Sequence, residues 1–126
     1  MTAAWTKDEL SRIEQADELR IAPLRGDGTS RDETTIWVVR DGDDLYVRAY
    51  RGREGAWYRD ATDRHQGRIS SGGVTKDVTL AEAGDAALAE RLDAAYRSKY
   101  GHYSATYVDP MVADGARNAT LKLVPR

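Results

Sequence analysis

Apolar and polar residues near the start of the chain alternate as in an amphipathic helix with a defined first turn. Thr6 and Glu9 have the spacing of a capping box, in which each side chain accepts a hydrogen bond from the other residue's backbone N–H. Trp5 and Leu10 occupy the two positions of a hydrophobic staple across the same turn. The pattern therefore predicts a helix over about residues 7–17 that buries one apolar face.

The next segments alternate with a period of two, which is typical of strands. Residues 18–25 form one such segment, and Pro23 within it marks an edge strand or an irregular strand end. Residues 34–40 are apolar on both faces, as in a strand that is buried on both sides. Residues 45–50 alternate again after a turn signal, so we predict a hairpin over residues 34–50 and a loop before it.

The second half of the chain shows both periods. Helical spacing predicts one or two turns over residues 56–63 and a long helix over residues 85–100, which Gly101 would end in a left-handed conformation. Residues 67–80 suit two short strands joined by a Ser-Gly-Gly turn, and residues 119–124 suit a final strand. The stretch between the long helix and the final strand is predicted to be a loop, with room for one helical turn after Asp109-Pro110.

These elements predict the fold class α+β, mainly β. About six short strands in a chain of 126 residues close most easily into a barrel, with the long helix covering an open seam. A chain of this length suits one hydrophobic core, so we expect residues 1–126 to form a single domain.

The amino-acid composition argues against several classes of functional site. The chain has no cysteine and only two histidines, which excludes thiol nucleophiles, disulfides and iron–sulfur clusters and argues against a metal site. A formal net charge of −2 gives no general attraction to nucleic acid. No apolar run approaches the ~20 residues of a spanning helix, and the first residues lack the layout of a signal peptide. We therefore expect a cytoplasmic protein without metal, membrane or nucleic-acid partners.

The charge is unevenly distributed along the chain. Residues 48–68 contain six arginines and three acidic residues, which gives this stretch a formal charge of +3. Within it a predicted strand enters a loop that contains Gly52 and Gly55, and a helical turn follows whose unpaired amides would face that loop. Arg51 and Arg53 could add bidentate contacts to phosphate oxygens. The stretch therefore predicts an anion-binding turn.

Two interpretations of this turn remain open on the residues alone. In the first, Trp57 and Tyr58 lie against a ring system that is attached to the bound phosphate. In the second, the turn is solvated, Trp57 belongs to the hydrophobic core, and the arginines pair with Glu54 and Asp60.

The doubly apolar strand also bears on assembly. Ile36 and Val38 would occupy one face of residues 34–40, and Trp37 and Val39 would occupy the other. A lone barrel of this size would have difficulty covering both faces, so we predict a twofold homodimer.

Several segments together resemble a small bacterial family that is catalogued only as a domain of unknown function. The resemblance runs from Trp5 to Arg126 and is carried by RIAPLRGDGTSRDETTIWVVRDGDDLYVRAYRGREGAWYRDA, GRISSGG, DAAYRSKYG and ATLKLVPR.

A second resemblance concerns residues 45–61, LYVRAYRGREGAWYRDA. They are similar to the part of deazaflavin-dependent nitroreductases in which a strand enters an Ala-Ser-x-Gly-Gly loop and then a Trp-Tyr-x-Asn-Leu helix. Four residues hold the corresponding places: Ala49, Gly52, Trp57 and Tyr58. The chain departs from the motif at Tyr50, which stands in the place of the serine, in the spacing of the glycines, and at Arg59 and Asp60 before the leucine position.

This resemblance implies a fold and a cofactor site. Deazaflavin-dependent nitroreductases and pyridoxamine-phosphate oxidases are split β-barrels that bind a flavin or deazaflavin phosphate at the loop after this strand. By analogy, FMN or a deazaflavin coenzyme would contact Ala49, Tyr50, Arg51, Gly52, Arg53, Gly55, Trp57 and Tyr58. In that arrangement the two arginines and the Gly52 and Gly55 amides would hold the phosphate, and the two aromatic residues would shape the ring pocket.

The function implied is an oxidoreductase that transfers a hydride to a small molecule through such a cofactor. The resemblance assigns no catalytic residue and no substrate. Two alternatives remain: a non-catalytic module that binds a phosphorylated or acidic small molecule, and a structural dimer whose basic stretch docks an acidic protein partner.

Overall fold

Seven strands form one antiparallel sheet in the order β2-β1-β5-β6-β7-β4-β3. The computed structural model describes residues 4–24, 27, 29–83, 85–103 and 105–126. The strands are β1 (Leu19–Pro23), β2 (Thr34–Ile36), β3 (Val39–Asp41), β4 (Asp44–Arg48), β5 (Gln66–Ser71), β6 (Val74–Glu82) and β7 (Thr120–Pro125).

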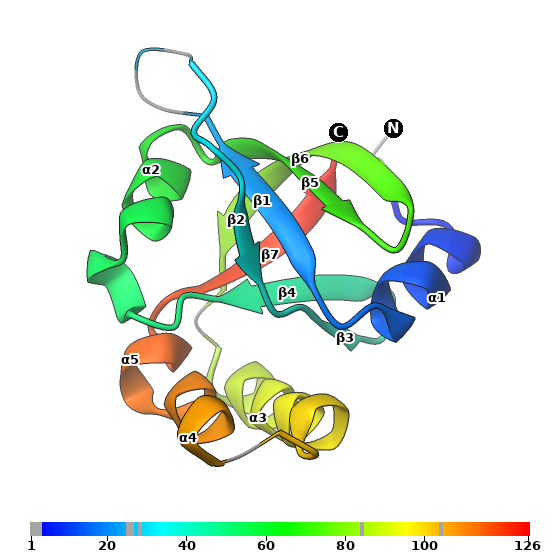
Figure 1. Ribbon diagram of the computed structural model, residues 1–126, viewed down its shortest axis with the longest axis vertical. Coiled ribbons are helices and arrows are strands. Elements are labelled where there is room, and N and C mark those ends of the chain that lie inside the picture. Colours follow the sequence, from blue (N-terminus) through cyan, green and yellow to red (C-terminus); the bar gives the residue numbers. More distant parts are fainter. Residues whose placement is uncertain (1–3, 25–26, 28, 84, 104) are drawn as a thin grey trace.

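Helices cover the ends and one side of this sheet (Figure 1). In that view α1 and α2 lie at opposite ends of the sheet, and α3, α4 and α5 lie together below β3 and β4. The helices are α1 (Lys7–Gln15), α2 (Ala56–Arg64), α3 (Ala86–Tyr100), α4 (Ala105–Val108) and α5 (Asp114–Arg117), with 3-10 turns η1 (Gly52–Glu54) and η2 (Asp109–Val112). Among the described residues, no helix is long and apolar enough to cross a membrane.

The sheet curls strongly, which its connectivity requires. Strands β2 and β3 lie at the two outer positions of the sheet, yet only Trp37 and Val38 separate them in the chain. Neighbouring strands in a flat sheet lie about 4.8 Å apart, so two residues could not join the edges of a flat seven-stranded sheet. The sheet therefore curls until its edges approach each other, and the predicted α+β split barrel is confirmed.

The predicted strand over residues 34–40 is in fact two strands. Ile36 in β2 pairs with Leu19 in β1, whereas Val39 in β3 pairs with Tyr46 in β4, at the other edge of the sheet. This division raises the strand number from about six to seven and restricts the hairpin expected over residues 34–50 to β3 and β4.

The division also explains why this segment is apolar on both faces. One hydrophobic cluster fills the barrel and includes Leu19, Ile21 and Val38, with Ile36 packed against it. A second cluster contains Val39 together with residues of α3 and η2, and Trp37 packs against that one. Helices of the same chain therefore bury Val39 and pack against part of Trp37. Much of the apolar surface that suggested a homodimer is accounted for within one chain, and the dimer remains a prediction.

The amino-terminal helix begins as predicted. The Thr6 hydroxyl accepts a hydrogen bond from the Glu9 backbone N–H at 3.1 Å, and the Glu9 carboxylate accepts one from the Thr6 N–H at 2.9 Å. Trp5 and Leu10 are both buried in the barrel cluster. The helix ends at Gln15, two residues before the predicted end.

The long helix is also confirmed, but the left-handed end expected at Gly101 is wrong, and the loop expected after it is only partly correct. Asp85 caps α3 by accepting a hydrogen bond from the Leu88 N–H at 2.9 Å. Gly101 has a right-handed φ of −63°, and its role is spatial, because a Cβ there would lie 2.3 Å from the Arg97 carbonyl oxygen. The region predicted to be a loop contains α4, η2 and α5, and η2 is the helical turn expected at Asp109-Pro110. Of the loop predicted over residues 25–33, residues 25, 26 and 28 lie outside the described part of the chain.

Candidate functional site

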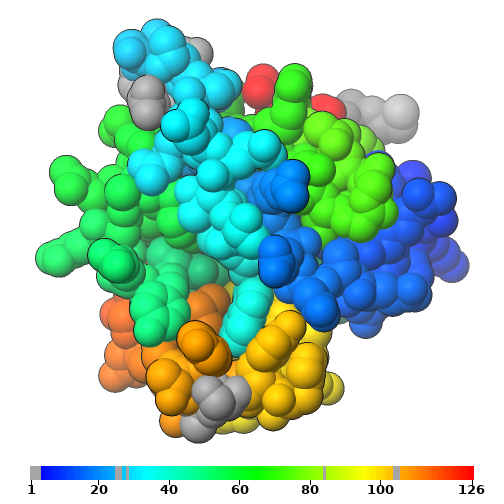
Figure 2. All heavy atoms as spheres, viewed as in Figure 1, coloured from blue at the N-terminus to red at the C-terminus, as the bar shows by residue number. Residues whose placement is uncertain are grey.

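A pocket of about 470 Å³ lies where three segments distant in sequence come together. In Figure 2 the cyan segment near β2 lies between the green segment of α2 and the orange segment of α4 and η2. The lining residues are Arg31, Thr34, Thr35, Ile36, Trp37, Arg48, Tyr50, Arg51, Gly55, Ala56, Trp57, Tyr107 and Met111. Its volume is in the range of small-molecule sites in proteins.

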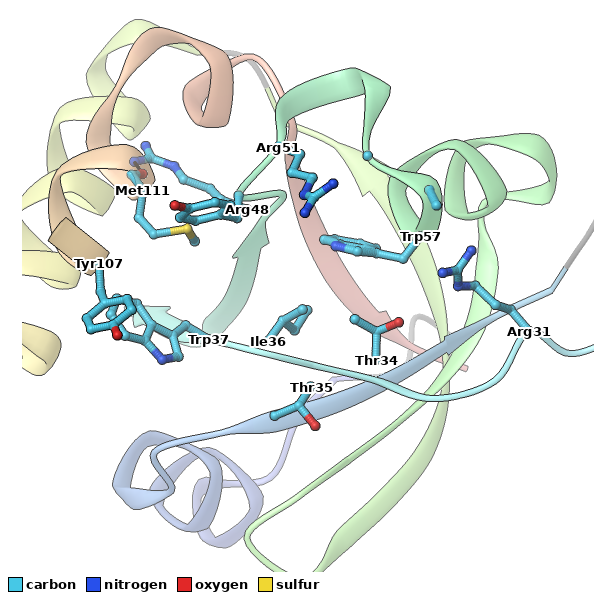
Figure 3. Close-up of a pocket in the computed structure, with 13 residues that line it drawn as sticks. Arg31, Thr34, Thr35, Ile36, Trp37, Arg48, Arg51, Trp57, Tyr107 and Met111 are labelled. Carbon is cyan, nitrogen blue, oxygen red and sulfur yellow. Dashed lines mark hydrogen bonds between the residues drawn. The ribbon is translucent and has the colours of Figure 1, made fainter.

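The pocket has two chemically different ends, as Figure 3 shows. Arg51 lies beside the Trp57 ring at one end, and Arg31 approaches from the same side. Trp37, Tyr107 and Met111 gather at the other end. We refer to these as the arginine end and the aromatic end.

Four of the eight predicted cofactor-binding residues line the pocket: Tyr50, Arg51, Gly55 and Trp57. Gly55 immediately precedes α2, and Trp57 lies in its first turn. Trp57 is only 8% exposed, so it belongs to the barrel core and contributes the edge of that core to the pocket. Tyr50 is 55% exposed at the pocket wall.

Three of the other predicted residues lie outside the pocket lining and shape the chain behind it. Ala49 is buried, and its N–H donates to the Ala119 carbonyl at 3.0 Å. Gly52 has a φ of +72° and lies so close to α5 that an added Cβ would be 3.2 Å from the Gly115 carbonyl oxygen. Tyr58 is buried, and its hydroxyl donates to the Glu82 carboxylate at 3.3 Å.

Arg53 lies within the η1 turn, and Arg51 immediately precedes that turn. Its guanidinium donates to the Asn118 carbonyl and to the Glu82 carboxylate, each at 3.2 Å. It is absent from the pocket lining. The two arginines that were predicted to hold one phosphate therefore have different surroundings.

The backbone amides of the two glycines in the predicted anion-binding turn already have hydrogen-bond acceptors. The Gly52 N–H donates to the Ala49 carbonyl at 2.9 Å, and the Gly55 N–H donates to the Gly52 carbonyl at 3.1 Å. The amides without an acceptor in the described chain are those of Ala56, Trp57 and Tyr58, because the first backbone bond of α2 runs from Arg59 to Gly55. The helix end that attracts anions is thus the first turn of α2.

Two arginines make the α2 end of the pocket positive. Arg51 has no hydrogen-bond or ion-pair partner among the described residues. Arg31 donates from Nη1 to the Asp60 carboxylate at 2.9 Å, while its Nε is buried without a partner. Arg31 precedes β2 at the end of a polar loop, and no motif in the sequence signals its position here.

A buried ion cluster supports the wall between β4 and the helices. Arg48 is 1% exposed and donates from Nη1 to the Asp93 carboxylate at 2.6 Å. Arg117 donates from Nε to the same carboxylate at 2.9 Å. Burial raises the pKa of Asp93, but the hydrogen bonds from Arg117 and Arg48 outweigh it and hold that pKa below its usual value.

Arg48 also fixes the backbone that forms the aromatic end. Its guanidinium donates to the Met111 carbonyl at 2.9 Å and to the Ala89 carbonyl at 3.1 Å. Met111 and Tyr107 reach the pocket from η2 and α4, segments that were predicted to be mostly loop. The described residues contain no group of three or more histidine, aspartate or glutamate side chains placed to hold a metal ion.

The family described as an uncharacterized protein conserved in bacteria (DUF2255) matches residues 9–123, and the chain belongs to this family. The resemblance to a bacterial family of this kind is thereby confirmed. No curated protein matches the sequence.

Several solved structures are similar to this fold at low sequence identity. A candidate pyridoxamine 5′-phosphate oxidase from Listeria innocua has a TM-score of 0.66 and 15% identity, covering 93% of this chain and 90% of the other. A FAD-binding protein from Mesorhizobium loti has a TM-score of 0.65 and 13% identity, covering 100% and 94%. An F420-H2-dependent reductase has a TM-score of 0.63 and 15% identity, covering 86% and 93%.

A heme storage protein from Vibrio cholerae is similar as well, with a TM-score of 0.63, 9% identity, and coverage of 98% of this chain and 92% of its own. At these identities the similarity establishes the fold alone. The ligand must be argued from the residues of the pocket.

Proposed function

We propose that the pocket binds a flavin or a deazaflavin coenzyme and that the protein is an oxidoreductase that passes a hydride to a small molecule. The observation that carries this proposal is the arginine end, where unpartnered Arg51 lies beside Trp57 and the free amides of the first α2 turn. A phosphate and a ring system joined in one ligand would satisfy these groups together. Two similar structures support the choice, because one is a FAD-binding protein and another is an F420-H2-dependent reductase.

The donors at this end fit a phosphate. A phosphate oxygen placed before α2 would accept from amides that lack other acceptors, and the helix dipole would favour its charge. Arg51 could add a charge-assisted bond without breaking an existing ion pair. Arg31 would contribute positive potential, and its buried Nε is a donor without a partner.

The surroundings of Trp57 fit a ring system. Trp57 at the arginine end and Ile36 next to it present apolar surface, and Thr34 lies beside them (Figure 3). When bound, a flavin or deazaflavin supplies the hydride chemistry. The protein would hold the phosphate, orient the ring and exclude water from it, so the proposal requires no nucleophilic side chain.

Heme and a redox-inactive phosphorylated ligand are the competing occupants. Histidine is a common axial ligand of heme iron in proteins. The pocket lining contains no histidine. A redox-inactive phosphorylated molecule would use the same phosphate donors and would differ only in giving no hydride transfer.

Spectroscopy of the purified protein tests the proposal. We expect flavin or deazaflavin absorbance in the protein as isolated, or saturable binding of added FMN or F420, together with a rise in melting temperature. A Soret band and tight heme binding without flavin binding would contradict the proposal. Stabilisation by ribose 5-phosphate, with no response to FMN or F420, would favour the redox-inactive binding module instead.

A further inference from the structure

The aromatic end of the pocket presents one open face of the Trp37 indole. The Trp37 ring stacks on Tyr100 with centroids 4.0 Å apart and an interplanar angle of 1°. The Tyr103 centroid lies 5.5 Å from Trp37 and 6.2 Å from Tyr100. If the two tyrosines lay on opposite faces of the indole, their separation would approach the sum of their distances to it. Neither tyrosine therefore covers the other face of the indole, and Trp37 lines the pocket.

This indole is held in a fixed orientation. Tyr100 is fully buried, and its hydroxyl donates to the Asp17 carbonyl at 2.7 Å and accepts from the Val38 N–H at 3.2 Å. Lys99 donates to the Val38 carbonyl at 2.8 Å, which fixes the same short connection between β2 and β3. Hydrogen bonds thus hold both Tyr100, on which Trp37 stacks, and the backbone of Val38 next to Trp37. The Trp37 ring can therefore bind a ligand without reorganisation, which lowers the entropic cost of binding.

The aromatic end offers no free charge. Arg48 is the charged residue of the lining nearest to Met111, and its charge is neutralised by Asp93 at 2.6 Å. Its other bonds go to main-chain carbonyls and to the Thr120 hydroxyl. An anionic ligand would find its counter-charge at the arginine end, in Arg51, which has no ion-pair partner among the described residues, whereas Arg31 is paired with Asp60. The open surface at the aromatic end comes from Trp37, Tyr107 and Met111 and suits a flat, uncharged ligand.

We propose that the aromatic end is a second subsite, which binds a neutral, planar aromatic or conjugated molecule stacked on Trp37. This inference rests on the proposed function, since the stacked molecule would be the one that receives the hydride. It assigns two tryptophans of one pocket to two different rings: Trp57 to the cofactor and Trp37 to the substrate.

Calorimetric titration with 2-naphthamide tests the subsite, with FMN titrated separately. We expect Trp37→Leu to weaken 2-naphthamide binding roughly tenfold, because a stacked aromatic face and its buried area are lost. Tyr107→Ala is the second variant, and its side chain is 59% exposed, so folding should survive. It should weaken the same probe several-fold. Arg51→Ala is the matched control: it should weaken FMN and leave 2-naphthamide unchanged.

A charged probe checks the chemical class. 2-Naphthoate has the shape of 2-naphthamide but carries a negative charge. In the presence of saturating FMN, we expect 2-naphthoate to bind more weakly than 2-naphthamide. Equal or tighter binding of the naphthoate would contradict a neutral subsite. Competition between FMN and 2-naphthamide would place both in one position and would also overturn the inference.

The two proposals fail in different ways. If FMN binds and 2-naphthamide does not, or if neither Trp37→Leu nor Tyr107→Ala weakens 2-naphthamide binding, the second subsite is wrong and the cofactor proposal stands. If 2-naphthamide binding depends on Trp37 while FMN and F420 do not bind, the stacking subsite stands and the cofactor proposal fails.

Discussion

Asp93 is the single carboxylate on which the wall of the pocket depends. It accepts hydrogen bonds from buried Arg48 and half-exposed Arg117, and Arg48 in turn holds the Met111 carbonyl. A buried arginine without its counter-ion is far more costly than the pair is favourable. This side chain therefore provides a direct test of the buried cluster.

We expect Asp93→Asn to lower the free energy of unfolding by about 3–5 kcal/mol, because it leaves Arg48 charged and buried without compensation. Urea denaturation of the variant measures this loss. Asp114→Asn is the matched control, since Asp114 also pairs with Arg117 but its side chain is 91% exposed. Its effect should stay within about 0.5 kcal/mol. Equal effects of the two substitutions would contradict the role given to Asp93.

Lys99 predicts an alkaline dependence of stability. Burial lowers the pKa of Lys99 to about 8, while Asp17 and Glu14 act in the opposite direction. Above that pH the folded state loses the proton, whereas the unfolded chain keeps it until near its ordinary pKa. The unfolded state then binds more protons, so the contribution of Lys99 to stability rises as the pH increases through about 8.

Denaturation of the parent protein and of Lys99→Met between about pH 7 and 9.5 measures this contribution. The free energy of unfolding of the parent should rise relative to that of the variant across this range. The upper limit stays below the pKa of about 10 at which tyrosines titrate in the unfolded chain, and burial raises the pKa values of Tyr96 and Tyr100 in the folded state. Parallel profiles for the two proteins would show that the Lys99 amine titrates normally.

The turn between β5 and β6 fixes α1 against the sheet. Gly72 in that turn has a φ of +58°, and a Cβ there would lie 2.4 Å from the Arg12 carbonyl oxygen. Gly42 in the β3–β4 turn has a similar φ of +61° with nothing within 4 Å of a Cβ. The two glycines share the backbone requirement and differ only in their surroundings.

Alanine at these two positions separates backbone strain from packing. Gly42→Ala should cost about 1–2 kcal/mol of unfolding free energy, the cost of a left-handed L-residue. Gly72→Ala should cost about 1–3 kcal/mol more, because α1 must shift away from the added methyl group. Thermal and urea denaturation measure both losses. Equal costs would show that α1 is not held by close approach to this turn.

Elements with strong local signals were predictable from the sequence, and elements defined by long-range contacts were not. The capping box of α1 and the Asp85 cap of α3 mark helices within a few residues. Residues 34–40 carry the same pattern whether they form one doubly buried strand or two strands that face different layers. Asp109-Pro110 indicated the helical turn of η2, but no local pattern indicated that Arg48, far from it in sequence, holds its Met111 carbonyl.

The same distinction applies to the pocket. Tyr50, Arg51, Gly55 and Trp57 were predictable because they lie on one continuous stretch between β4 and α2. Composition and spacing could not separate Arg51 from Arg53, since the η1 turn decides which of them faces the pocket. Other lining residues come from segments that only the curled sheet and its helices bring together: Arg31, Trp37, Tyr107 and Met111.

The assembly of the protein remains a prediction. Residues of the same chain bury Val39 and pack against Trp37, so most of the apolar surface that suggested the dimer is already used. Tyr50 and Tyr107 are exposed large aromatic side chains at the pocket, and they are the contact that we expect a homodimer to bury. Sedimentation equilibrium should therefore give twice the chain mass of 14.0 kDa. A species of 14.0 kDa at all concentrations would contradict the dimer.

Binding of FMN and riboflavin to the Arg51→Ala and Arg53→Ala variants tests the central claim most directly. Both substitutions remove one arginine near η1, but only Arg51 lines the pocket, whereas Arg53 contacts Glu82 and Asn118. We expect Arg51→Ala to weaken FMN binding by roughly ten- to a hundredfold, the loss of one charge-assisted contact, and Arg53→Ala to leave it nearly unchanged.

Riboflavin lacks the phosphate, so its weaker binding should be the same in the parent and in both variants. The contrary result is FMN binding that is equal in the parent and Arg51→Ala, or that falls equally in both variants. Either outcome would show that Arg51 and the first turn of α2 do not form a phosphate site.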